Sequence, residues 1–359
     1  MCSWVSSYGS SWASNSYSLD GVPSEVPFGH LDLTGDDSFF GDCCICDSRL
    51  YIRTGGDDEQ GYLTCYDLNA NRIDWRKNYK FGHTSSMTIE NGKLAVGYLI
   101  VDASNGELIF DIRDYFNGFE DDIYGLTYFS NNLLCKSTDF YTPDSGYVFC
   151  DIDVKDADNV NIPGGSIKFI RSDILVCLDG NRVYSYGLDT RDVLWEQIVE
   201  TDDPIIHLFD DKVVILDGQL IREVSLRSGS ILHEVCLADN ISELSTNQMK
   251  NLNDFSSCIC EDSLVIYNGL GMDSWIMVIE RSSYEVLYIK TDHDIGVVRI
   301  CGDLIFYCNG QNKIQALWKD SGKLAWTSRE NITARSINSA GNFLVVGVIH
   351  GGFTIFKVS

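Results

Sequence analysis

The chain of 359 residues carries 27 basic and 52 acidic side chains, which give a formal net charge of -25 at pH 7. This charge disfavours binding to nucleic acid or anionic membranes and attracts basic partners. No apolar stretch approaches the length of a membrane span, and the N-terminus lacks a basic patch followed by an apolar core. The thirteen cysteines are an odd number without the spacing of bridges or zinc sites. We therefore expect a cytoplasmic protein in a reducing compartment.

Residues 1–37 precede the regular part of the chain. Their serine-rich first half is typical of a disordered tail, but Trp4 and Trp12 are unusual in one. We favour a strand within Ser11–Asp20, followed by a linker. This segment is predicted to act as a clasp for the rest of the chain.

A short phrase recurs eight times from residue 38 onward: a polar turn, then an aliphatic or aromatic residue that opens an apolar run. The opening residues are Leu50, Leu94, Leu133, Ile174, Val213, Leu264, Leu304 and Phe343. They are 44, 39, 41, 39, 51, 40 and 39 residues apart. This period is typical of the blades of a β-propeller and not of a helical solenoid.

A second phrase runs in phase with the first. Tyr66 starts a span that ends nine residues later at Trp75, with Asn and Asp between them. The same offset recurs in Val101 to Phe110, Tyr186 to Trp195, Val224 to His233, Ile279 to Tyr288 and Leu317 to Trp326. Turn residues flanked by apolar and aromatic residues predict a strand, a tight turn and a second strand in each span.

The last repeat predicts only three strands, near Arg335–Ser339, Phe343–Val348 and Gly352–Val358. An unpaired edge would remain unless another segment completes this sheet, so the N-terminal clasp is expected to fill it. We predict an all-β, eight-bladed β-propeller whose ring is closed by an N-terminal strand. Seven blades are the alternative. Residues 1–359 are expected to form one domain, with the propeller repeats in 38–359.

The seventh repeat resembles a known family. Its sequence Ala316-Leu317-Trp318-Lys319-Asp320-Ser321-Gly322-Lys323-Leu324-Ala325-Trp326 is similar to the Ala-Leu-Asp-x-x-Thr-Gly-Lys-x-x-Trp repeat of quinoprotein-like (PQQ-like repeat) propellers. The match is partial in the first, second, fourth and fifth repeats and poor in the third. The resemblance implies a fold shared by quinone-dependent alcohol dehydrogenases, an outer-membrane assembly lipoprotein and many non-enzymatic binding modules.

Catalytic patterns are missing from the sequence. The six histidines share no spacing, and no phosphate-cradling glycine motif follows a strand. Cys43 and Cys44 are adjacent, as in the vicinal disulfide that quinoprotein dehydrogenases stack on their cofactor. We interpret them as small residues that pack the innermost strand. We therefore expect no catalytic residue, no metal site and no cofactor.

The order of strands assigns each loop to one end of its sheet. Links between repeats and turns between second and third strands share one end, which is expected to be acidic and to carry aromatic rings. Aromatic rings supply contact area and carboxylates steer a basic partner. The predicted partner-binding residues are Asp57, Asp58, Glu59, Tyr115, Phe116, Phe119, Glu120, Asp121, Asp122, Phe140, Tyr141, Asp202, Asp203, Asp292 and Asp294. A solvated acidic rim is the alternative.

The sequence favours a non-enzymatic protein-binding propeller that is monomeric on its own. One concrete version is an intracellular immunity protein that sequesters a basic toxin or another cationic partner. The alternatives are a quinoprotein-type cofactor-binding enzyme and an assembly scaffold.

Overall fold

The computed structural model describes part of the chain. The described residues are 21–25, 27–31, 40–54, 60–81, 87–96, 99–111, 114, 123–129, 132–137, 147–151, 156–160, 162, 164–237, 256–269, 274–348 and 352–358. The chain divides into two compact units: unit 1 comprises Met1–Trp12 and Gly35–Ile198, and unit 2 comprises Ala13–Thr34 and Val199–Ser359. Each unit is described separately.

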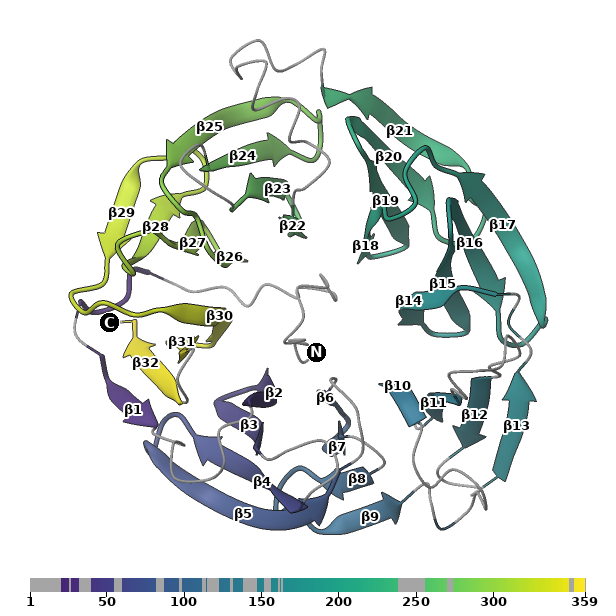
Figure 1. Cartoon of the computed structure of the whole chain (residues 1–359), viewed down its shortest axis with the longest axis horizontal. Coiled ribbons are helices and arrows are strands. Elements are labelled where there is room, and N and C mark those ends of the chain that lie inside the picture. Colours follow the sequence, from purple (N-terminus) through teal and green to yellow (C-terminus); the bar gives the residue numbers. More distant parts are fainter. Residues whose placement is uncertain are drawn as a thin grey trace. The chain divides into compact units, whose positions relative to one another are not determined.

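Unit 1 contains four sheets of four strands among its described residues (Figure 1). Its strands are β2 (Phe40–Cys46), β3 (Arg49–Thr54), β4 (Gln60–Asp67), β5 (Arg72–Lys80), β6 (Met87–Glu90), β7 (Lys93–Val96), β8 (Leu99–Asp102), β9 (Leu108–Asp111), β10 (Ile123–Phe129), β11 (Asn132–Ser137), β12 (Tyr147–Asp151), β13 (Asp156–Val160), β14 (Ser166–Arg171), β15 (Ile174–Asp179), β16 (Arg182–Gly187) and β17 (Asp192–Ile198). In each sheet, strands that follow one another in sequence pair antiparallel.

Unit 2 also contains four sheets of four strands among its described residues. Its strands are β1 (Gly29–Leu31), β18 (Ile205–Phe209), β19 (Lys212–Asp217), β20 (Leu220–Ser225), β21 (Ile231–Cys236), β22 (Ser256–Ile259), β23 (Ser263–Asn268), β24 (Ser274–Glu280), β25 (Val286–Asp292), β26 (Val298–Cys301), β27 (Leu304–Cys308), β28 (Ile314–Trp318), β29 (Leu324–Thr327), β30 (Ala334–Ala340), β31 (Phe343–Val348) and β32 (Phe353–Lys357). The described part of the chain has no α-helix, which agrees with the all-β prediction. None of it forms a helix long and apolar enough to cross a membrane.

The sheets pack face to face through their central strands. Leu264 and Ile266 on β23 are fully buried against Val214 and Leu216 of the preceding sheet, while Val265 faces Ile305 of the next sheet. A strand buried on both faces needs a continuous apolar run, because alternate side chains enter opposite cores. The eight apolar runs of the sequence are therefore second strands of sheets.

The second sequence phrase forms the hairpin between third and fourth strands. The register shifts by one residue at equivalent positions, for example between Cys65 and Tyr66 and between Ala316 and Leu317. A residue with positive φ follows in each turn: Asn71, Gly106, Arg191, Gly229, Tyr284 and Gly322. This combination of a bulge and a left-handed residue is a common way to close a short hairpin. The strand, turn and strand predicted for these spans are confirmed.

The aromatic residue that ends each phrase joins neighbouring sheets. In unit 1, Trp75 packs against Tyr51 and donates its indole N–H to the carbonyl of Ala103 in the next sheet at 3.2 Å. In unit 2, Trp326 contacts Phe306 of its own sheet and Phe356 of the next, with ring centroids 6.2 and 5.3 Å apart. A large ring at this position buries enough apolar area to hold two sheets together.

The left-handed turn residue packs directly on the preceding aromatic. A Cβ atom added to Gly322 would lie 2.7 Å from Tyr288, and one added to Gly106 would lie 2.7 Å from Trp75. The equivalent residue in sheet β22–β25 is Tyr284, and the ring opposite it is the smaller His233, with centroids 5.7 Å apart. A larger turn residue is thus matched by a smaller ring.

We expect Gly322→Ala to lower the free energy of unfolding by about 2–3 kcal/mol, since alanine disfavours positive φ by about 1 kcal/mol and its methyl group would press on Tyr288. The matched control is Gly341→Ala. Gly341 also has a positive φ, but an added Cβ there meets open space. Urea denaturation of both variants measures the difference. Equal losses would show that the contact with Tyr288 contributes nothing.

The N-terminal segment completes the C-terminal sheet. Strand β1 pairs with β32, with Gly29 opposite Ile355 and Leu31 opposite Phe353. Phe28 packs on Phe343 at 5.7 Å, beside the ammonium group of Lys357. The expectation of an N-terminal strand in this sheet is confirmed, and the three strands predicted for the last repeat are present.

The position predicted for that strand was wrong. We expected it within 11–20, a range outside the described residues, but Gly29–Leu31 occupies the outer edge of the sheet. The physical reason is that backbone pairing needs no apolar run. The ring of Phe28 and the hydrogen bonds of Ser24 and Phe28 to β32 hold this segment in place.

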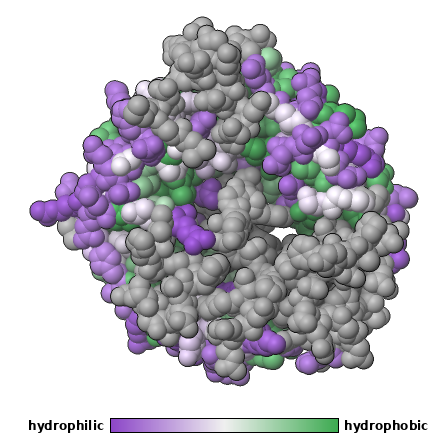
Figure 2. Space-filling model, in the orientation of Figure 1, coloured by the Kyte–Doolittle hydropathy of each residue, from purple (hydrophilic) through white to green (hydrophobic). Residues whose placement is uncertain are grey.

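The outer strands expose several aliphatic side chains. Ile73, Leu108, Ile231 and Leu324 each follow the turn between third and fourth strands and are about half exposed. In Figure 2, hydrophobic residues accordingly appear among hydrophilic ones near the edge of the view. Singly scattered aliphatic residues of this kind are normal on protein surfaces.

Candidate protein-binding face

Each sheet has two ends with different loops. The turns between first and second strands and between third and fourth strands lie at one end, which we call the turn face. The turns between second and third strands and the links between sheets lie at the other end, which we call the linking face. Charged side chains lie at both ends, and some of the basic ones at the turn face form ion pairs.

The link before β18 presents two carboxylates on a fixed backbone. Asp202 and Asp203 are exposed. The buried carboxylate of Asp217, at the end of β19, accepts the N–H groups of Glu200 at 2.7 Å and Thr201 at 2.9 Å, as well as the Thr201 hydroxyl at 2.9 Å. A carboxylate that accepts several hydrogen bonds from one loop fixes its conformation. Asp217 thus positions the two exposed acids.

The link before β26 is anchored to the turn between β27 and β28. Gly310 donates its N–H to the carbonyl of His293 at 3.0 Å. A Cβ atom on Gly310 would lie 3.0 Å from the Cβ of Asp294, so this close approach favours glycine. The side chain of Asn309 accepts two backbone N–H groups of its own turn at 3.1 Å. Asp294 is exposed on this link.

Asp292 differs from Asp202, Asp203 and Asp294 because its carboxylate accepts hydrogen bonds from other groups of the protein. It accepts the hydroxyl of Tyr307 at 2.9 Å and the N–H of His293 at 2.8 Å. Burial and the nearby charge of Asp292 raise the pKa of Tyr307, so its hydroxyl stays protonated as a donor. Asp292 therefore fixes the link and is only partly available to a partner.

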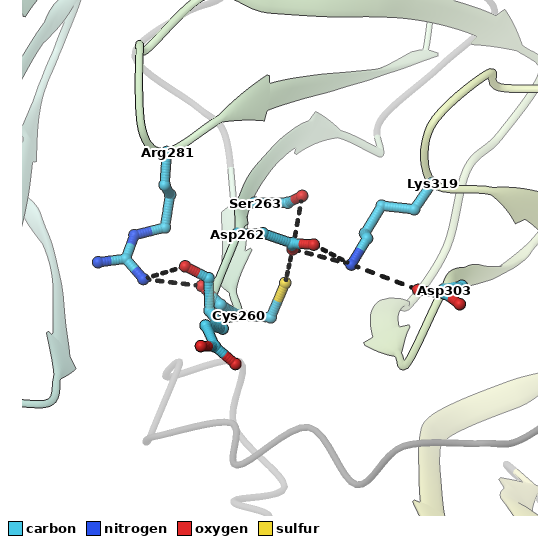
Figure 3. Close-up of polar contacts among 7 residues, drawn as sticks. Cys260, Asp262, Ser263, Arg281, Asp303 and Lys319 are labelled. Atoms are coloured by element: carbon cyan, nitrogen blue, oxygen red, sulfur yellow. Dashed lines mark hydrogen bonds and ion pairs between the residues drawn. The ribbon is translucent and has the colours of Figure 1, made fainter.

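Lys319 of the turn face is held by two carboxylates. Figure 3 shows Lys319 pointing toward Asp262, with 2.8 Å between its Nζ and both carboxylate oxygens. Asp303 lies on the other side of the ammonium group at 3.9 Å. Burial favours the protonated form of Asp262, but the hydrogen bonds of Lys319, Cys260 and Ser263, together with the charge of Lys319, outweigh this effect and lower its pKa.

Glu223 is the centre of a buried cluster on the turn face of unit 2. Its side chain is 2% exposed, and its Oε1 lies 2.6 Å from Nζ of Lys212. Its Oε2 accepts the hydroxyl of Tyr284 at 2.7 Å and lies 3.5 Å from a guanidinium nitrogen of Arg281. Burial disfavours the charge, but these donors outweigh it and lower the pKa of Glu223. Arg281 also donates to the carbonyls of Cys260 and Glu261.

The exposed acids of the linking face lack such partners. Asp202, Asp203 and Asp294 form no ion pair with any described residue. Their charges are therefore uncompensated over the part of the structure that is described. Uncompensated carboxylates on anchored links can attract a cationic surface without losing an internal interaction.

Four of the fifteen predicted partner-binding residues can be placed. Asp202 and Asp203 share one link of unit 2, while Asp292 ends β25 and Asp294 lies on the link that follows it. The remaining predicted residues lie outside the described part of the chain: Asp57, Asp58, Glu59, Tyr115, Phe116, Phe119, Glu120, Asp121, Asp122, Phe140 and Tyr141. Sequence reasoning missed the supporting residues Asp217 and Tyr307. For Asp217, the following Gly218-Gln219 turn was an available signal.

Sequence reasoning also missed a buried pair on two first strands. Nε2 of His207 on β18 lies 2.7 Å from Oγ of Ser257 on β22. Burial, with the charges of Arg299 and Arg281, lowers the pKa of His207 to about 3. Both side chains are at most 3% exposed, so a substrate has no access to the hydroxyl. The pair joins two sheets. No cluster of metal-ligating residues occurs among the described residues.

Comparison with solved structures identifies the fold. The computationally designed Ika8 protein has a TM-score of 0.62 at 11% identity and covers 95% of this chain and 99% of its own. BamB from Moraxella catarrhalis has a TM-score of 0.59 at 11% identity, covering 93% and 98%. A europium-containing methanol dehydrogenase has a TM-score of 0.60 at 10% identity, covering 93% and 88%.

The fold is a β-propeller. No family model matches the sequence, and no curated protein matches it. At identities of 10–11%, these β-propellers indicate the fold alone. One of them is named as an enzyme, so the β-propeller fold by itself does not distinguish a binding module from an enzyme.

Proposed function

We propose that this β-propeller is a non-enzymatic protein-binding module that holds a cationic partner against its linking face. The observation that carries the proposal is that exposed carboxylates without an ion pair to any described residue lie on links that the fold holds in place. Lys212 and Lys319 of the turn face lie within 2.6–2.8 Å of carboxylates. Asp202, Asp203 and Asp294 of the linking face have no ion-pair partner among the described residues.

The anchoring of the links also supports the proposal. A flexible loop loses conformational entropy when it binds, whereas a loop that is already fixed loses little. Asp217 holds the link of Asp202 and Asp203 through three hydrogen bonds, and Gly310 holds that of Asp294. The acidic groups are thus preorganised, and the net charge of -25 adds long-range attraction for a basic protein.

The narrower form of the proposal is a cytoplasmic immunity protein that sequesters a basic toxin. Its support is the acidic linking face together with the net charge of -25. From the phrase at Ala316–Trp326 we also infer that the chain is related to quinoprotein-like propellers, and that its eight sheets are the blades of one ring. A quinoprotein-type enzyme is the rival, and a quinone absorbance band after reconstitution would favour it.

Charge reversal on the linking face tests the proposal. We expect Asp202→Lys/Asp203→Lys/Asp294→Lys to weaken binding of a purified cationic partner at least tenfold and to reduce the salt dependence of its affinity. The partner is first captured on the immobilised chain and then measured by calorimetry at several salt concentrations. The two links should accept these changes without loss of folding, because the three side chains are exposed.

The matched control reverses three exposed carboxylates in turns of the turn face. Asp189→Lys/Glu285→Lys/Asp320→Lys changes the net charge by the same amount. It should leave affinity within about twofold of the wild type, because the contacts are local and distant exposed charges are screened. Equal weakening by both triple variants would show that net charge, and not the linking face, controls binding.

A further inference from the structure

The outer strands of the sheets differ in their basic charge. Strand β5 is the last strand of its sheet (Figure 1) and contains four lysines and arginines, Arg72, Arg76, Lys77 and Lys80. The other seven outer strands, β1, β9, β13, β17, β21, β25 and β29, together contain one, Lys290 of β25. Strand β5 is therefore a basic strand in a chain of net charge -25.

Protection of an exposed edge does not explain the charge of β5. Lysines on an edge strand usually prevent it from pairing with another chain. The outer strand β9 has no basic residue, although its Leu108 and Ile109 are 47% and 43% exposed. An apolar edge in the same unit is thus left without this protection.

The basic side chains of β5 lie on two faces of the sheet. Side chains alternate along a strand, and the burial of β5 follows this alternation in its second half. Lys77 faces the next sheet, where its ammonium group lies 2.7 Å from the carboxylate of Glu107. Arg76, Asn78 and Lys80, which we call the basic row, lie on the opposite face and are exposed. The charge of Lys77 is thus already paired, whereas the basic row faces solvent.

Two members of the basic row are suited to binding carboxylates. The guanidinium of Arg76 stacks on the ring of Tyr62, 3.9 Å from its centre. Such stacking uses the face of the guanidinium, whereas a carboxylate binds the N–H groups at its edge. Lys80 forms no ion pair with any residue in the described part of the chain. Carboxylates would therefore meet an oriented guanidinium and an unpaired ammonium group.

The backbone of β5 offers a second kind of contact. Strand β5 pairs with β4, from Asp67 opposite Arg72 to Gln60 opposite Lys80, and its other edge pairs with no described strand. Its nine residues make it the longest outer strand of the described sheets, ahead of β17 and β25 with seven each. An edge of this length can form hydrogen bonds with several residues of an added strand.

We propose that the free edge of β5 binds an extended, acidic segment of a partner protein as an additional strand. Alternate residues of an added strand lie about 6.7 Å apart, which is also the spacing along the basic row. Carboxylates four residues apart can thus lie opposite Arg76 and Lys80 while the backbone pairs with β5. This edge belongs to unit 1, and the described acids of the linking face belong to unit 2. The proposal therefore does not depend on the cationic partner.

The test uses the full chain and three ten-residue peptides. A peptide of alternating Glu and Thr can pair as a strand, a Gln-Thr peptide lacks the charge, and a Glu-Pro peptide keeps the charge but lacks every second backbone N–H. We expect calorimetry to show that the Glu-Thr peptide binds at least tenfold more tightly than either of the others. It should also slow hydrogen–deuterium exchange in residues 72–80 and not in the outer strand of residues 192–198, because pairing protects outward-facing amides.

Two variants assign the binding to the basic row. Arg76→Gln/Lys80→Gln removes both of its charges from exposed positions and should weaken binding of the Glu-Thr peptide at least tenfold. The matched control is Lys290→Gln/Lys323→Gln, which removes one charge from β25 and one from the turn before β29. The control loses the same net charge and should bind the Glu-Thr peptide like the wild type.

Equal binding of the Glu-Thr peptide by the wild type and Arg76→Gln/Lys80→Gln would overturn the proposal. So would equal binding of the Glu-Thr and Glu-Pro peptides, which would show attraction between charges without an added strand. Equal binding of the Glu-Thr and Gln-Thr peptides would show strand pairing without recognition of acidic residues. Unchanged exchange in residues 72–80 would place the bound peptide on another surface.

Discussion

Glu223→Ala is expected to lower the free energy of unfolding by about 3–5 kcal/mol, because it leaves buried charges without their counter-ion. In the folded protein Glu223 forms an ion pair with Lys212, accepts the hydroxyl of Tyr284 and lies beside Arg281, whose side chain is 7% exposed. The guanidinium of Arg281 also stacks 4.0 Å from the centre of the Phe209 ring and cannot turn to solvent without losing that contact. Urea denaturation at pH 7 measures the loss.

Glu234→Ala is the matched control for this prediction. Glu234 also pairs with an arginine, Arg222, at 2.8 Å, but its side chain is 45% exposed. Exposed ion pairs contribute about 0–1 kcal/mol, because water screens them. Glu223→Gln should lose an amount of unfolding free energy between those of Glu223→Ala and Glu234→Ala, since the amide still accepts a hydrogen bond from Tyr284. Similar losses for Glu223→Ala and Glu234→Ala would contradict the role of the cluster.

The second large effect is a loss of stability in acid that depends on His207. Burial and the charges of Arg299 and Arg281 lower its pKa to about 3 in the folded protein, against 6.5 for an ordinary histidine. Between these values the unfolded chain binds a proton that the folded chain does not. Stability is therefore fully present above pH 6.5 and decreases as the pH falls, by at most about 1.4 kcal/mol per pH unit.

Between pH 7 and pH 5 this single group should reduce the free energy of unfolding by about 2 kcal/mol. Between pH 7 and pH 5, we expect the free energy of unfolding of His207→Gln to fall by about 2 kcal/mol less than that of the wild type. This difference does not depend on how stable the variant is at pH 7. His293→Gln, which removes an exposed histidine from a link, should follow the wild-type pH dependence. A wild-type curve parallel to that of His207→Gln would show that the folded protein takes up this proton over the same pH range as the unfolded chain, and would contradict the lowered pKa.

The repeated sheets were predictable because their signals are local. The phrase from Tyr66 to Trp75 contains both strands of a hairpin and the turn that joins them, so ten residues are enough to predict it. Strand β1 has no comparable signal. Gly29–Leu31 is a strand because β32 offers its edge and Phe28 packs on Phe343, a contact between distant parts of the chain.

In the candidate site, too, some features follow from local sequence and others from contacts between distant residues. Chain order alone assigns Asp202 and Asp294 to links, and the structure places both there. Which carboxylates are free for a partner depends on residues far along the chain. Asp292 is held by Tyr307 on another sheet, and Lys319 is neutralised by Asp262, fifty-seven residues away. Which of these charges are paired emerges only from the fold.

Zero-length cross-linking of the purified complex with a water-soluble carbodiimide tests the central claim most directly. This reagent joins a carboxylate to a lysine amine in contact with it, so mass spectrometry of the cross-linked peptides identifies the bound face. We predict cross-links from the partner to Asp202, Asp203 and Asp294. Cross-links concentrated at Asp189, Glu285 and Asp320, with none on the two links, would contradict the assignment of the linking face.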